Sequence, residues 1–119
     1  MRKALFLHTE ADKDLIVGFA LQLSDDPTDI ETLCLQRCPS LEFALPPEEW
    51  GVNVSLESDD ANELLVAIEF QSTAACVVVR TTERTYEINI SKVDADEIQA
   101  MREVFKAMCF DQSFTIENV

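Results

Sequence analysis

Apolar and polar residues alternate along much of this chain with the period of two that a half-buried β-strand requires. The clearest case is the segment 51–57, where Val52, Val54 and Leu56 fall on one face and polar residues stand between them. Segment 14–23 is nearly continuous in apolar residues and is therefore predicted to be a central strand. Segments with strand spacing are 3–9, 14–23, 31–37, 51–57, 64–70, 74–81 and 85–90.

One of these segments, 64–70, fits two structures. Leu64, Val66, Ile68 and Phe70 alternate as a strand does, whereas Leu64, Leu65 and Ile68 have the spacing of a helix face. The β-branched and aromatic residues favour a strand, because they suit a pleated surface.

The period changes to that of a helix over 94–109. Asp94 and Glu97 resemble a capping box, with Asp in place of Ser or Thr. The apolar stripe is typical of core packing and consists of Ile98, Met101, Val104, Phe105 and Met108.

These elements predict an α+β fold, a mostly antiparallel β-sheet of about six to seven strands with one C-terminal amphipathic helix packed on it. Pro39, Pro46 and Pro47 deny strand hydrogen bonds and predict a loop between 38 and 50. The chain contains two Gly and four Pro and no stretch with the composition of a linker, so 1–119 is predicted to be a single domain.

The net charge of the chain limits the kinds of molecule that it is expected to bind. Lys and Arg number 9 and Asp and Glu number 23, which gives a formal net charge of −14. A nucleic-acid binder needs a basic surface, and so does a protein that binds anionic membranes, so neither partner is expected. The N-terminal residues lack the core of an export signal and no apolar run reaches the roughly 20 residues of a membrane span, which predicts a cytoplasmic protein.

Residues that carry catalytic chemistry are scarce. His8 is the one histidine, so a nucleophilic triad or a zinc site would depend on it, and Gly18 and Gly51 lie too far apart for a phosphate-binding loop. The cysteines are predicted to be small buried hydrophobes, and a zinc site at Cys34 and Cys38 is disfavoured by their spacing. The sequence therefore predicts no enzyme, no metal and no cofactor.

Carboxylates gather in two turns without a cation, 24–31 and 57–63, and beside the single Trp50. One interpretation is that these charges only keep a small protein soluble. The other is a negative surface that binds a basic protein, with the tryptophan as an anchor. The candidate partner-binding residues are Asp25, Asp26, Asp29, Glu31, Glu48, Glu49, Trp50, Glu57, Asp59, Asp60 and Glu63.

The order of the segments resembles the immunity protein ten family of bacterial polymorphic-toxin systems. The resemblance covers about residues 12–110 and departs from the family pattern after Glu63, where a tyrosine and paired glycines are replaced by LLVAIE. It rests on LIVGFA at 15–20, DDPTD at 25–29, LCLQR at 33–37, GVNVSLE at 51–57, INI at 88–90 and VFKAMCF at 104–110.

The resemblance implies a mostly β fold with a C-terminal helix and a small cytosolic protein that neutralises a cognate toxin by binding it. It carries over no toxin-contacting residue. We therefore expect a non-catalytic, acidic protein-binding module whose partner is a basic protein toxin. The alternatives are an acidic secretion chaperone, which would be a dimer with exposed apolar patches on helix and sheet, and a small-ligand-binding domain.

Overall fold

The structure is a computed structural model that describes residues 2–59, 62–71 and 75–118. In this part of the chain the fold is α+β and mostly strand, with one α-helix near the C-terminus, which confirms the α+β class and the C-terminal helix of the prediction. The strands are β1 (Arg2–Ala11), β2 (Leu15–Gln22), β3 (Ile30–Arg37), β4 (Asn53–Leu56), β5 (Asn62–Gln71), β6 (Cys76–Thr81), β7 (Thr85–Asn89) and β8 (Thr115–Asn118). The helices are α1 (Ala95–Met108) and two 3-10 helices, η1 (Pro39–Ala44) and η2 (Pro47–Glu49).

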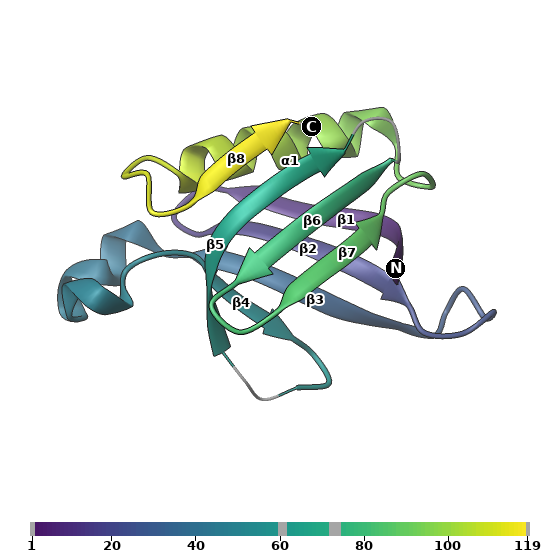
Figure 1. The fold of residues 1–119 in the computed structure, drawn as a ribbon, viewed down its shortest axis with the longest axis horizontal. Helices are drawn as coiled ribbons and strands as arrows, with labels where there is room; N and C mark the ends of the chain where they lie inside the picture. The colour runs from purple at the N-terminus through teal and green to yellow at the C-terminus, as the bar shows by residue number, and fades with distance from the viewer. Residues whose placement is uncertain (1, 60–61, 72–74, 119) are drawn as a thin grey trace.

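The strands do not form the plain antiparallel sheet that the alternation predicts. They follow the order β4-β3-β2-β1-β7-β6-β5-β8, and β4 also pairs with β5, so that seven strands close into a barrel (Figure 1). Two pairs, β1 with β7 and β5 with β8, are parallel. Alternation of side chains fixes which face of a strand is buried but not which strand lies beside it, so the closure was not predicted.

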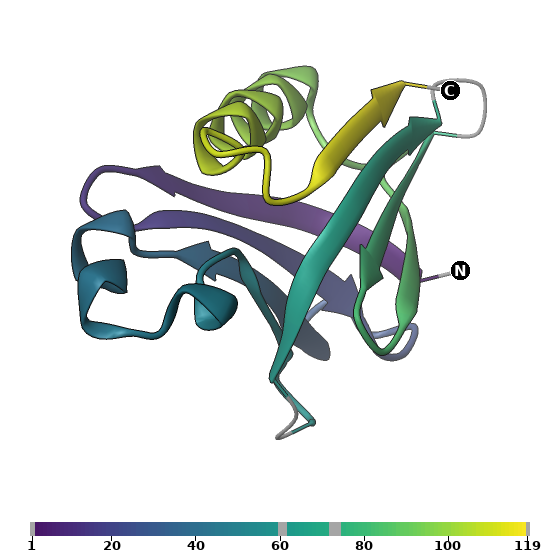
Figure 2. The same ribbon diagram turned by 60° about the vertical axis from the view of Figure 1, so that its left-hand side comes forward.

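Helix α1 covers a gap in the barrel wall (Figure 2). Strand β1 pairs with β7 only at Arg2 and Lys3, and further along β1 the backbone N–H of Leu7 donates to Glu97 Oε1 of the helix, at 3.3 Å. Glu97 therefore binds strand β1 and does not cap the helix. Asp94 makes no side-chain capping hydrogen bond, so the predicted capping box is wrong. The helix replaces a strand partner that β1 lacks at this position.

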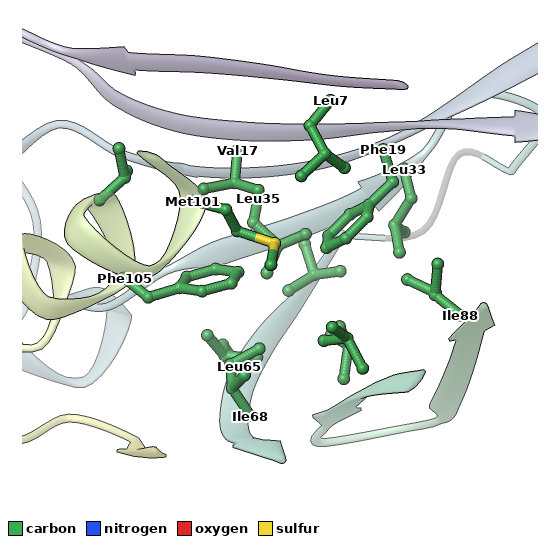
Figure 3. Close-up of a cluster of buried hydrophobic side chains, with 14 of the residues drawn as sticks. Leu7, Val17, Phe19, Leu33, Leu35, Leu65, Ile68, Ile88, Met101 and Phe105 are labelled. Atoms are coloured by element: carbon green, nitrogen blue, oxygen red, sulfur yellow. The ribbon is translucent and has the colours of Figure 1, made fainter. Parts of the chain in front are cut away.

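The core lies between the two halves of the barrel and under the helix. Met101 and Phe105 of α1 point towards Leu65 and Ile68 of β5 (Figure 3). The Phe105 ring also packs against Phe70, with centroids 6.2 Å apart. The helix stripe is therefore part of the core, with Ile98 half-buried at its edge.

Several predicted ranges differ from the observed strands. Segment 64–70 lies within β5, whereas strand β8 was not predicted and only 53–56 of the predicted 51–57 is strand. Residue 74 of the predicted strand 74–81 lies outside the described residues. Of the cysteines only Cys76 is fully buried, and the other three are half-buried.

Candidate functional site

Three of the candidate carboxylates, Asp25, Asp26 and Asp29, lie in the exposed turn between β2 and β3. Asp26 accepts hydrogen bonds from the backbone N–H and the hydroxyl of Thr28, at 2.9 and 2.8 Å, and these bonds lower its pKa. Asp26 therefore shapes the turn itself. Asp25 and Asp29 present exposed side chains beside it.

Glu31, at the start of β3, is buried and bound within the protein. Arg2 Nη2 lies 2.7 Å from Glu31 Oε1, and the Ser58 hydroxyl, then Arg2, lower the pKa of Glu31 against the effect of burial. Glu57, directly after β4, is exposed, and its Oε1 accepts a hydrogen bond of 2.9 Å from the backbone N–H of Thr32 in β3. The two acidic turns thus meet at one end of the barrel, where Arg2 supplies a cation from the N-terminus.

A second arginine meets the turn between β4 and β5. Arg84, in the β6–β7 hairpin, contacts Asp59 Oδ2 at 2.6 Å and Glu63 Oε2 at 3.0 Å. Glu63 is only 4% exposed and also accepts hydrogen bonds from the hydroxyls of Thr81 and Tyr86. These contacts make Asp59 and Glu63 structural, and they raise the pKa of Arg84, Asp59 most strongly. Asp60 lies outside the described residues.

The remaining candidates, Glu48, Glu49 and Trp50, lie at the opposite end of β3 and β4. They belong to the connection 39–50, which we call the β3–β4 segment and which projects from the barrel (Figures 1 and 2). Prolines begin both of its 3-10 helices, and neither helix contains a buried residue. Trp50 Nε1 donates to the Leu45 carbonyl, at 3.1 Å, which folds the segment back on itself.

This segment exposes large apolar side chains, of which only Trp50 is among the predicted partner-binding residues. Phe43 is 81% exposed and Leu41 is 61% exposed, and Leu45 and Trp50 are also exposed. The signal was present in the sequence, because Leu41, Phe43 and Leu45 recur at every second position between prolines that forbid a central strand. Apolar residues that cannot enter a sheet remain on the surface. Here they lie in the same segment as Glu48 and Glu49, whose carboxylates form no ion pair among the described residues.

One buried cation holds the base of the β3–β4 segment. Arg37, at the end of β3, is fully buried and makes a paired contact with Glu42, at 2.8 and 3.0 Å, and with Asp111, at 2.8 and 2.7 Å. It also donates to the Met108 carbonyl, at 2.9 Å, and its guanidinium lies under the Phe110 ring. Bidentate pairs of this kind fix geometry, so Arg37 ties the segment to the C-terminal end of α1.

A groove of about 600 Å³ runs beside this anchor, between the β3–β4 segment and the outer faces of β3, β4 and β5. Gln36, Asn53 and Asn62 line it from the strands, and Leu41, Leu45 and Glu49 line it from the segment. Leu41 and Leu45 therefore belong both to the exposed apolar side chains of the segment and to the wall of the groove.

Other kinds of site are not apparent in the described residues. His8 is exposed and lies 3.2 Å from Glu10, and no group of three metal-ligating side chains occurs in residues 2–59, 62–71 and 75–118. No helix in the same residues has the length and hydropathy to span a membrane. Comparison with protein-family models, with curated proteins and with solved structures gives no significant match to this chain.

Proposed function

We propose that this chain is a non-catalytic protein-binding module, an immunity protein that binds and neutralises a basic bacterial toxin in the cytoplasm. The observation that carries the proposal is the β3–β4 segment, which exposes Phe43, Leu41 and Trp50 beside the carboxylates of Glu48 and Glu49. Aromatic anchors with a charged rim are the usual composition of a protein-binding surface.

The location of the free carboxylates supports the same surface. Glu31, Glu63 and Asp59 are bound to arginines of the chain itself, so their charge is already largely offset. Glu48 and Glu49 are exposed and have no ion-pair partner among the described residues. With a net charge of −14 on the whole chain, they would steer a basic partner towards the apolar side chains.

The secretion-chaperone alternative finds less support. That hypothesis needs an exposed apolar face on the helix, and Met101 and Phe105 of α1 are 0% exposed in the core. Four of the eight large apolar side chains that are exposed in the described residues lie in the β3–β4 segment, and they include Phe43, which is the most exposed of them.

The test uses the toxin domain encoded next to this gene, purified, with binding measured by surface plasmon resonance and protection measured by growth on co-expression. We expect Phe43→Ser to weaken binding by about tenfold or more, because an aromatic anchor at an interface is worth more than about 1.4 kcal/mol. Leu23→Ser is the matched control, since Leu23 is 51% exposed in the β2–β3 turn at the other end of the barrel.

The charge component is tested separately. Glu48→Gln with Glu49→Gln should lower the association rate and its salt dependence, and Asp25→Asn with Asp29→Asn should change both less. Absence of binding to the toxin, or equal losses for Phe43→Ser and Leu23→Ser, would contradict the proposal.

A further inference from the structure

The groove beside the β3–β4 segment has a polar floor made by neighbouring strands. Gln36 of β3 pairs in register with Asn53 of β4, and Ser55 of β4 pairs with Asn62 of β5. Within the part of the chain that the structure describes, the side-chain amides of Gln36, Asn53 and Asn62 enter no hydrogen bond. Their carbonyl oxygens are therefore available to accept hydrogen bonds from a ligand.

The walls of the groove are apolar. Leu41 and Leu45 line it from the β3–β4 segment, and Leu64 lines it from β5. Aliphatic walls over a floor of amide oxygens suit a side chain with a long methylene stem and a polar head.

The charged side chains at the groove sum to a negative charge, which favours a cationic ligand. Arg37 lines one end, but it is paired with both Glu42 and Asp111, so no positive charge is left over for an anion. Glu49 adds a carboxylate that has no ion-pair partner among the described residues. The sum of these charges is negative, which excludes phosphates and carboxylates as ligands and favours a basic group.

We propose that this groove binds an arginine side chain from a loop of the partner protein. The inference rests on the proposed function and narrows it, because it states which residue of the basic partner enters the surface. The guanidinium donates to the amide oxygens of the floor and to Glu49, and the methylene stem lies along the leucine walls. Arginine fits better than lysine, because its five N–H donors are spread in a plane and reach several acceptors at once.

The probe is a blocked tripeptide, acetyl-Gly-Arg-Gly-amide, added to the ¹⁵N-labelled full chain. We expect saturable shifts of the side-chain amide resonances of Gln36, Asn53 and Asn62. The matched peptide with citrulline, which is neutral and nearly isosteric, should cause no saturable shift. Glu49→Gln should raise the dissociation constant of the arginine peptide threefold or more, and the dispersion of the backbone spectrum verifies that this variant is folded.

Three results would overturn the inference. They are the absence of saturable shifts with the arginine peptide, equal shifts with the citrulline peptide, and equal affinity for acetyl-Gly-Lys-Gly-amide, which would mean that any cation is accepted. Toxin binding separates this failure from failure of the proposed function. If Phe43→Ser weakens toxin binding but Asn53→Leu and Glu49→Gln do not, the function stands and the groove assignment falls.

Discussion

Arg37 is the centre of the polar cluster that joins the β3–β4 segment to the C-terminal end of α1. It is fully buried, and its guanidinium serves two carboxylates, a helix-terminal carbonyl and the Ser113 hydroxyl. The hydrogen bonds that Arg37 donates to Asp111 are the main reason that the pKa of Arg37 is raised, so its charge is fixed. A buried cation of this kind is tolerated because every N–H group that faces the protein has an acceptor.

We predict that Arg37→Met lowers the free energy of unfolding by about 3–5 kcal/mol, because the substitution leaves Glu42 and the Met108 carbonyl without their donor. Urea denaturation measures the loss. The control is Arg80→Met, since Arg80 makes an exposed ion pair of 3.1 Å with Glu69 that is worth about 1 kcal/mol or less. Equal losses for the two variants would show that Arg37 is not a structural anchor.

The same cluster predicts a dependence on pH. Arg37 holds the pKa of Asp111 at about 2, below the ordinary value of 3.8. Between these values the unfolded chain binds a proton at Asp111 and the folded chain does not, so this carboxylate stabilises the fold fully above pH 3.8 and loses its contribution as the pH falls towards 2.

The stability difference between wild type and Asp111→Asn should therefore narrow as the pH is lowered from 5 to about 2. Urea denaturation at a series of pH values measures the difference. A gap that stays constant across this range would rule out the proposed linkage between Asp111 and Arg37.

At the scale of elements, the turn into β4 depends on the backbone of Gly51. Its φ is +138°, in a region that L side chains rarely adopt, and its N–H donates to Glu42 Oε2 at 3.5 Å. The space beside it is open enough for a methyl group, since an added Cβ would lie 3.7 Å from Leu64 Cδ2. The demand for glycine here is one of backbone conformation.

Gly51→Ala should accordingly cost about 1–3 kcal/mol through backbone strain. Gly18→Ala is the matched control, because an added Cβ there meets Thr32 and His8 at ordinary contact distances of 3.6 and 3.7 Å and its φ is not positive. That change should be neutral or stabilise by up to about 1 kcal/mol. Thermal unfolding measures the stability of both variants. A larger loss of stability for Gly18→Ala than for Gly51→Ala would contradict the proposed role of backbone strain at Gly51.

At the scale of the whole molecule, the excess of carboxylates repels itself. The formal net charge of −14 already includes the positive charges of Arg2, Arg37 and Arg84, so the internal pairs that these arginines form leave the excess of carboxylates unchanged. At 0.1 M, salt screens the interaction between charges that lie more than about 10 Å apart. It therefore weakens the long-range repulsion between carboxylates more than it weakens the close ion pairs.

Raising sodium chloride from 10 to 200 mM should thus increase the melting temperature by about 2–4 °C, measured by calorimetry. A melting temperature that falls with salt would mean that the arginine pairs dominate the electrostatics of the fold. Arg84→Gln tests that alternative directly, because it removes two of the close pairs.

The sequence predicts the helix and seven of the eight described strands, all but β8, because alternation and helical spacing are local properties. The barrel closure and the internal ion pairs are not local. Arg2 and Glu31 are 29 positions apart, and the turn that holds Asp59 receives Arg84 from a later hairpin. Turns that lack a cation in sequence acquire one in space, which is why Glu31 and Glu63, both candidate binding residues, are buried in ion pairs within the chain.

The sequence of the β3–β4 segment can change during evolution with little effect on folding. Its two 3-10 helices contribute no buried residue, and Arg37 and Glu42 fix only its base. Most substitutions in the segment therefore leave the barrel core untouched, so its side chains can be replaced with little penalty to folding. A scaffold of this design can acquire a new binding preference by small steps while remaining foldable throughout.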